Sequence, residues 1–169
     1  MNDKKALKRA LVGSLGILLQ PLGFKVVASQ QSFRRATPDG WLSLHLAFVD
    51  HDMDFDVVLN AAVRFDEVQE GILPESAERR HTATIGCEYG NLTGQGQIRW
   101  KVADAQDVER VAQAIFEACA ATMTPFLEHY SDKRTVLEAL RRNDATSILI
   151  SPIDQRRARI VAFMNTMNL

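Results

Sequence analysis

The chain has 169 residues, of which 46% are hydrophobic and 24% are charged. This length suits one domain with its own core, and this composition excludes collagen-like, disordered and disulfide-scaffold classes. The 20 basic and 21 acidic residues leave a net charge of −1, so no overall positive charge favours nucleic acid or anionic lipid. We therefore expect one domain over residues 1–169 that binds neither nucleic acid nor membrane.

The N-terminal segment has the pattern of an amphipathic helix. Leucines recur at every third or fourth position from Leu7 to Leu22, which places them on one helical face. The pattern predicts a helix from about Asp3 to about Gln20, where Pro21 ends it. Basic residues before the apolar stretch also imitate a secretory signal peptide. The leucine spacing favours the helix, and with it a cytoplasmic protein.

Alternation of apolar and polar residues then predicts six β-strands. They are residues 24–28, 31–36, 41–48, 54–65, 82–89 and 97–102, with a further short strand at 147–150. The third and fourth strands form a hairpin, and we expect Phe48 to pair with Phe55 because this brings their apolar faces together. The acidic stretch at 66–80 is predicted to be a loop or a loose helical turn. The predicted core includes Leu44, Leu46, Phe55, Val57, Leu59, Ile85 and Trp100.

Helical patterns follow the strands. Asp104 begins a helix with an apolar face over residues 108–123, and Pro125 is expected to kink or end it. Ser131 is expected to cap the next helix, and a last helix spans residues 152–167. Strands in one run between helices predict an α+β fold. We expect an antiparallel sheet of five to six strands with the N-terminal helix and C-terminal helices packed on one face.

The sequence contains no motif that names a reaction. It lacks the H-E-x-x-H and G-x-S-x-G motifs and the glycine-rich phosphate loop. Cys87 and Cys119 form no C-x-x-C motif, which favours two buried thiols, although a disulfide between them stays open. Alternating aspartates at residues 50–56 resemble a calcium loop, but Ala61 stands where that loop has its last glutamate. We expect no catalytic residue, no metal site and no cofactor.

Polar side chains on the non-core side of the strands form one candidate ligand site. With the predicted pairing, Arg34, Ser43 and Asn60 line up across three strands, and His45, Asp56 and Arg64 lie diagonally nearby. Convergent polar groups on one face suit a small molecule or a nucleotide. The same pattern is also typical of a solvated sheet face.

An uneven charge distribution marks a second candidate surface. Residues 1–40 carry a net charge of +5, whereas residues 41–78 carry −8. An acidic sector of this kind steers association with a basic protein partner, or it only keeps the protein soluble. The partner-binding candidates are Asp50, Asp52, Asp54 and Asp56 at the hairpin, with Glu67 behind them.

Several short motifs together resemble a known family. They are Leu22-Gly23-Phe24-Lys25, Phe33-Arg34-Arg35, the hairpin Leu42–Val49, Glu88-Tyr89-Gly90-Asn91-Leu92, Trp100 and Pro125-Phe126-Leu127-Glu128. In this order they resemble the bacterial family of domain of unknown function 4304, over roughly residues 5–140. The resemblance implies a bacterial helix–sheet–helix protein of the cytoplasm, in which the last helix, at residues 152–167, is an addition to the family core. It also implies a relation to suspected immunity proteins, and it supplies no catalytic residues.

Three functions stay open from the sequence. The favoured one is a non-enzymatic protein-binding domain, such as an immunity protein that neutralises a toxin. The alternatives are a small-molecule or nucleotide-binding domain that uses the polar sheet face, and an unrecognised hydrolase. The absence of catalytic motifs leans against an enzyme.

Overall fold

A computed structural model describes residues 3–72, 82–142 and 153–169 of the chain. The strands are β1 (Lys25–Val27), β2 (Ser32–Thr37), β3 (Gly40–Asp50), β4 (Phe55–Phe65), β5 (Ile85–Glu88) and β6 (Trp100–Val102). The helices are α1 (Lys4–Leu19), α2 (Asp66–Ile72), α3 (Tyr89–Leu92), α4 (Ala105–Ala118), α5 (Thr124–His129), α6 (Lys133–Arg141) and α7 (Ile153–Thr166). The turns are η1 (Gln20–Leu22), η2 (Ala28–Gln30) and the π-helical η4 (Cys119–Met123). The strand expected at 147–150 lies outside the described residues.

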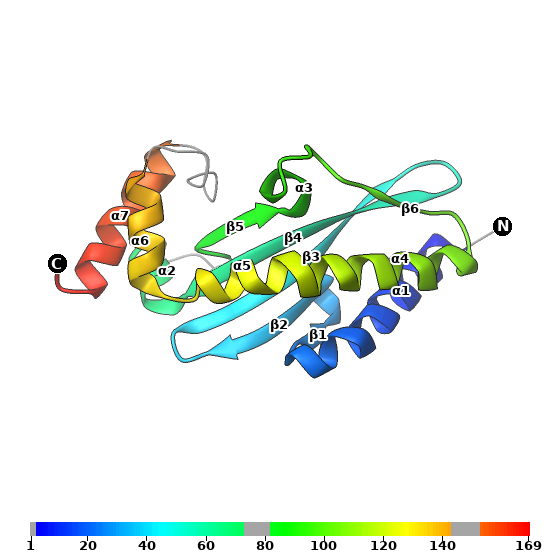
Figure 1. Ribbon diagram of the computed structural model, residues 1–169, viewed down its shortest axis with the longest axis horizontal. Helices are drawn as coiled ribbons and strands as arrows, with labels where there is room; N and C mark the ends of the chain where they lie inside the picture. Colours follow the sequence, from blue (N-terminus) through cyan, green and yellow to red (C-terminus); the bar gives the residue numbers. More distant parts are fainter. Residues whose placement is uncertain (1–2, 73–81, 143–152) are drawn as a thin grey trace.

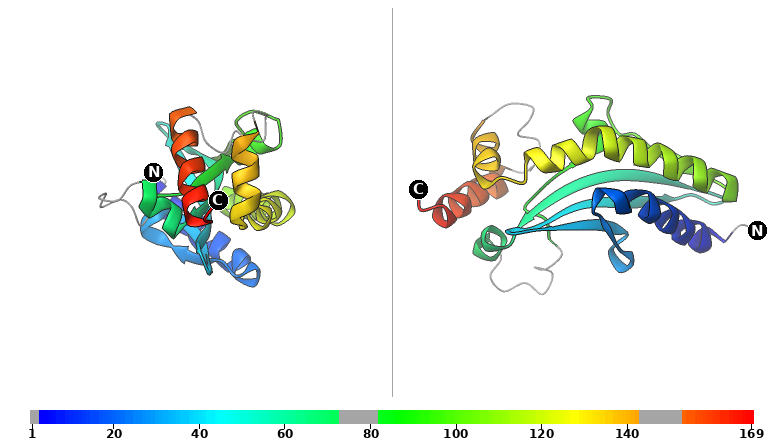
Figure 2. Two further views of the ribbon diagram at one scale, coloured as in Figure 1. Left: turned by 90° about the vertical axis from the view of Figure 1, so that its left-hand side faces the viewer. Right: turned by 60° about the horizontal axis from the view of Figure 1, so that its bottom comes forward.

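The six strands form one antiparallel sheet in the order β1-β2-β3-β4-β5, and β6 also pairs with β4. Strand β4 is central, because β3 follows one of its edges while β5 and β6 share the other. Helices α1 and α4 lie side by side across one face of this sheet (Figures 1 and 2). The α+β fold that the sequence predicts is therefore confirmed.

The β3–β4 hairpin differs from the expected pairing by two residues. Phe48 lies opposite Val57, and Phe55 lies opposite Asp50. The strands continue two residues further than the apolar pattern indicates, and the His51 N–H closes the loop by donating to the Asp54 carbonyl at 2.9 Å. A shift of two leaves every side chain on its expected face. The wrong register therefore changes which residues become cross-strand neighbours, but not the face on which each side chain lies.

The core lies between the sheet and the helix pair. Leu11 and Leu15 of α1 and Val111 and Ile115 of α4 are fully buried against it. Six of the seven predicted core residues are buried, whereas Trp100 is half-buried because its ring stacks on Tyr89 beside the sheet. No helix among the described residues is long and apolar enough to cross a membrane.

The long helix of the protein does not end at Pro125. Figure 1 shows α4, η4 and α5 as one continuous rod along the sheet. Pro125 stands in the first turn of α5, directly after the π-helical turn. A wider π turn changes the local hydrogen-bond pattern, and a first-turn proline needs no N–H partner. The expected kink or end is thus replaced by a change of helix type.

Helices α2, α6 and α7 gather at one end of the sheet (Figure 1). Residues 66–72, expected as a loop or a loose helical turn, form the short helix α2 directly after β4. Helix α7 packs on α2 and α6 instead of covering the sheet beside α4, and its Phe163 belongs to the common core. Asp132 caps α6 by accepting from the Thr135 N–H at 2.8 Å, in place of the expected Ser131.

Candidate ligand-binding site

The face of the sheet opposite α1 and α4 carries a hollow of about 450 Å³. Small-molecule sites have volumes of roughly 300–1,000 Å³, so the hollow is large enough for a small ligand. Strands β2, β3, β4 and β5 all contribute residues to it. We call this hollow the sheet-face trough.

The strand register explains why this face is hollow. Ser43, Ala62 and Gly86 lie opposite one another on β3, β4 and β5, and form a row of small residues across the sheet. A Cβ atom at position 86 would come within 2.9 Å of the Ala61 carbonyl oxygen, so no larger residue fits there without a shift. This row is the floor of the trough.

Larger residues stand on both sides of the floor. The row Ser32, His45, Asn60 and Glu88 runs along one side, because these residues pair across four strands. Trp41 stands on the other side, two residues before Ser43 on the same face of β3. Same-face rows in a sheet lie about 7 Å apart, which makes the trough narrow.

Arg34 closes the trough at its β2 end. It pairs with Ser43 in the register, and its guanidinium carbon lies 4.2 Å from the centre of the Trp41 ring. Burial lowers the pKa of Arg34, and the charge of Arg64 lowers it further, but a guanidinium stays charged at neutral pH. No carboxylate among the described residues forms an ion pair with Arg34, and its Nε atom is buried without a hydrogen-bond partner.

A second unpartnered group lies beside Arg34. Ser32 is 2% exposed, lines the trough and has an Oγ atom without a hydrogen-bond partner in the described structure. Leaving a buried hydroxyl unpaired costs about 1–3 kcal/mol. Two adjacent buried polar groups without partners are therefore expected to bind something that this structure does not contain, either water or a ligand.

Four of the five ligand-site candidates from the sequence line the trough, and their role in binding stays a prediction. Arg34, Ser43, His45 and Asn60 all line the trough, although Asn60 lies opposite His45 and not opposite Ser43. Burial lowers the pKa of His45, so this ring is neutral at pH 7 and has both a donor and an acceptor nitrogen.

Arg64, the fifth candidate, has a different role. It lies on the same sheet face but is 4% exposed, and its Nε atom donates to Asp66 at 2.6 Å. Its Nη1 atom donates to the Thr82 carbonyl at 2.7 Å. Arg64 therefore holds the segment before β5 in place and does not line the trough.

Ser32, Gly86 and Glu88 are among the trough residues that sequence reasoning missed. The strand alternation that identified Arg34 also assigns Ser32 to the same face. The strand order was needed for the other two, because only the pairing of β5 with β4 brings Gly86 and Glu88 to this face.

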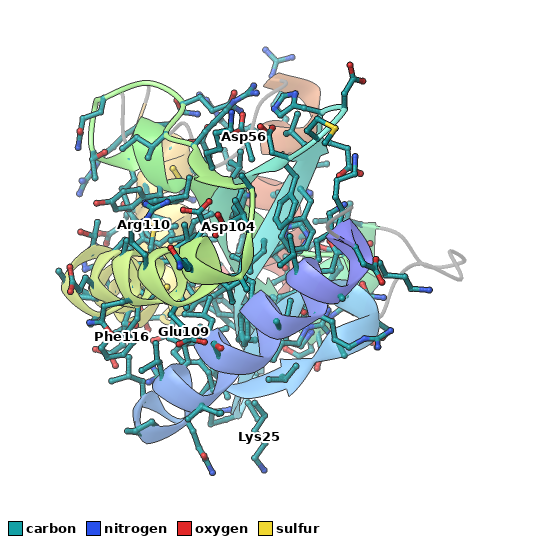
Figure 3. All side chains as sticks on the ribbon, turned by 90° about the vertical axis from the view of Figure 1, so that its right-hand side faces the viewer. Lys25, Asp56, Asp104, Glu109, Arg110 and Phe116 are labelled. Atoms are coloured by element: carbon teal, nitrogen blue, oxygen red, sulfur yellow. The ribbon has the colours of Figure 1, made fainter. Side chains whose placement is uncertain are left out.

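The acidic hairpin tip is largely neutralised by basic residues from elsewhere in the chain. Asp50 pairs with Lys8 at 2.7 Å, and Asp54 pairs with Lys101 at 2.7 Å. Asp56 accepts from His51 Nε2 at 3.0 Å, with Arg99 at 3.6 Å. Asp52 is exposed and has no ion pair among the described residues. The tip is thus a mixed-charge cluster, and its Asp56 is labelled in Figure 3.

Glu67 does not lie behind this tip. It belongs to α2, at the other end of β4 from the hairpin, and pairs with Lys133 at 3.3 Å. An 11-residue strand such as β4 separates its ends by more than about 30 Å. The acidic sector of the sequence is therefore divided between two ends of the sheet. A basic protein partner stays a prediction, and its charge argument is weaker.

The paired carboxylates predict a specific acid response. The hydrogen bond from His51 lowers the pKa of Asp56, and Arg99 lowers it further. A carboxyl whose pKa is lowered on folding stabilises the fold above its unfolded pKa, and this contribution is lost as the pH falls through the folded pKa. We expect Asp56→Asn to lower the free energy of unfolding by less than about 1 kcal/mol at about pH 5, and the difference from wild type to shrink as the pH falls below the ordinary aspartate pKa of about 4.

Urea titrations at several pH values measure this difference. Asp52→Asn is the matched control, because Asp52 lies on the same hairpin without an ion pair in the described structure. The ion-pair explanation would be contradicted if Asp52→Asn lowered the free energy of unfolding as much as Asp56→Asn does.

The cysteines and carboxylates suggest neither a nucleophile nor a metal centre. Cys87 and Cys119 are free thiols, so the disulfide left open by the sequence is not formed. Burial raises the pKa of Cys87, and raises that of Cys119 to about 12, which keeps both protonated at neutral pH. Within the described ranges, no group of three or more His, Cys, Asp or Glu residues is placed to hold a metal ion.

The fold and the trough together define an α+β domain with one helix-covered sheet face and one hollow polar face. No family model, curated protein or solved structure matches the chain. The resemblance to the family of domain of unknown function 4304 therefore stays a prediction, as does the relation to immunity proteins.

Proposed function

We propose that the protein is a binding protein for a small polar ligand, which occupies the sheet-face trough. The observation that carries the proposal is the pair of unpartnered buried groups, Arg34 Nε and Ser32 Oγ, beside a hollow of about 450 Å³. Arg34 as a whole is half-buried, and its buried, unpartnered Nε atom provides a charged donor at one end of the hollow.

The placement of the trough supports the same proposal. The floor residues Ser43, Ala62 and Gly86 lie on strands that pair with one another in the sheet. The floor is therefore rigid, and the site is already formed before a ligand binds. Asn60 and His45 offer donors and acceptors along one side, while Trp41 and Ala62 offer apolar surface. Such a mixture orients a small ligand through few polar contacts.

The acidic hairpin is a weaker candidate for a binding surface than the trough. Three of its four aspartates are paired within the chain, so a partner would have to displace Lys8, Lys101 or Arg99 from them. Displacing existing partners reduces the net gain from any new ion pair. We therefore place the primary function in the trough.

Filling the floor of the trough tests the proposal. Ala62→Leu adds a branched side chain between Ser43 and Gly86. Amide chemical shifts are followed while a defined panel is added: amino acids, short peptides, dicarboxylates, sugar phosphates and nucleoside monophosphates. We expect at least one compound to shift the amides of the floor residues in the wild type. The same compound should bind Ala62→Leu at least about tenfold more weakly.

Ala36→Leu is the matched control. Ala36 is exposed on the same sheet face but outside the trough, so this variant should bind as the wild type does. A wild-type spectrum in which no compound moves the trough amides would overturn the proposal, and so would equal binding by Ala62→Leu.

A further inference from the structure

The sheet-face trough has opposite charges at its two ends. Arg34 on β2 provides a guanidinium without an ion-pair partner in the described structure. Glu88 on β5 provides a carboxylate that also lines the trough, and no described cation lies within ion-pair distance of it. One Glu88 oxygen accepts from the Gly90 N–H at 3.1 Å, which leaves the other for a ligand.

The positions of the two ends give the length of the ligand. Strands β2 and β5 are separated by three strand-to-strand steps, which amount to about 14 Å. The Arg34 guanidinium leans over Trp41 on β3, which shortens the span across the strands by about one step, to roughly 10 Å. Arg34 and Glu88 also lie in neighbouring same-face rows, about 7 Å apart along the strands, so the diagonal between the two ends is about 12 Å. An extended chain of three to four amino acids spans this distance, at about 3.3–3.6 Å per residue.

The lining between the ends restricts the shape of the ligand. The floor of Ser43, Ala62 and Gly86 is narrow and follows a straight line across three strands. His45 and Asn60 stand beside it with donor and acceptor groups, which suit the N–H and C=O groups of a backbone. A thin, unbranched chain with repeated amide groups fits this lining better than a ring system does.

From these observations we infer that the trough binds a short zwitterionic peptide of about three to four small residues, with its carboxylate at Arg34 and its ammonium group at Glu88. The inference rests on the proposed function of the trough and names its ligand class. Arg34 offers its Nε edge to the carboxylate, in the side-on geometry that guanidinium groups use for carboxylates. Ser32 Oγ donates to the same carboxylate. No bond is made or broken, so the role is recognition alone.

Triglycine is the probe, because it has both charges, the required length and no side chains. Amide shifts of the wild-type protein are measured against triglycine, triglycinamide and N-acetyl-triglycine. Triglycinamide lacks the carboxylate and N-acetyl-triglycine lacks the ammonium group. We expect triglycine to bind most tightly and each blocked peptide to bind at least about tenfold more weakly.

Two variants assign the orientation. In Arg34→Gln, triglycine should weaken to the affinity of triglycinamide, and the two peptides should no longer differ. In Glu88→Gln, triglycine and N-acetyl-triglycine should no longer differ. The glutamine in Glu88→Gln retains an oxygen that accepts from Gly90, so the cap of α3 is kept.

Charge controls come from the same molecule. Lys25→Gln removes a positive charge from the residue opposite Arg34 on β1, whose side chain extends into solvent outside the trough (Figure 3). Glu117→Gln removes a negative charge from the exposed side of α4. Both variants should keep the wild-type preference among the three peptides.

The outcomes separate the two proposals. If triglycine and its blocked forms bind equally, or if Lys25→Gln has the effect of Arg34→Gln, the zwitterion inference is overturned. If none of the three peptides binds, but another compound of the panel shifts the amide signals of the trough residues, the zwitterion inference is wrong and the proposed function stands. If no compound moves them, both fail.

Discussion

Replacing Leu59 by alanine is expected to lower the free energy of unfolding by about 2–5 kcal/mol. Leu59 lies in the middle of β4, opposite Leu46, and its side chain is 0% exposed. Its methyl groups face α1 and α4, which cannot close completely over a smaller side chain because both are anchored along their lengths. The loss therefore includes a cavity term as well as the lost burial. Urea or guanidinium titration measures it directly.

Ile17→Ala is the control for this substitution. Ile17 is 73% exposed on α1, and exposed substitutions usually change stability by no more than about 0.5 kcal/mol. If Leu59→Ala lowers the free energy of unfolding no more than Ile17→Ala does, the placement of β4 beneath the helix pair is wrong.

Replacing Phe163 by alanine should lower the free energy of unfolding by about 3–5 kcal/mol. Phe163 belongs to α7, is 0% exposed and meets Phe65 at the end of β4 edge-to-face, with ring centres 5.3 Å apart. Aromatic pairs of this kind add about 0.5–1.5 kcal/mol beyond the area they bury. The C-terminal helix is thus expected to contribute to the stability of the whole sheet.

Val161→Ala provides the comparison within the same helix. Val161 is 57% exposed, so its replacement by alanine should hardly change the free energy of unfolding. Calorimetry distinguishes the two possible roles of α7. A single transition that moves to lower temperature in Phe163→Ala is expected, because a shared core unfolds cooperatively. An unchanged main transition would show that α7 is a separate appendage.

Local sequence patterns predicted the secondary structure well where side chains alternate strictly. Residues of β3 and β4 were assigned to the correct faces, because alternation along a strand determines the face of every side chain. The start of α4 at Asp104 followed from capping chemistry within one turn. The π-helical turn η4 was missed. Pro125 predicts a kink or an end of the helix, but it does not reveal the hydrogen-bond pattern of the turn that precedes it.

The acidic hairpin shows where charge counting along the chain fails. The net charge of residues 41–78 suggested one acidic surface, yet Lys8 and Lys101 come from distant segments to pair with Asp50 and Asp54. Charges interact through space at distances of a few ångströms. A sum over consecutive residues therefore says little about the surface that a partner meets.

By itself, the sequence determined the fold class, the faces of the strands and four of the residues that line the trough. These properties depend on periodicity, and periodicity is local. Tertiary structure alone decided the two-residue register shift, the pairing of Gly86 and Glu88 with β4, and the isolation of Arg34 from every described carboxylate. Each of these depends on which distant segments become neighbours, and many pairings satisfy the same alternation with nearly the same buried surface.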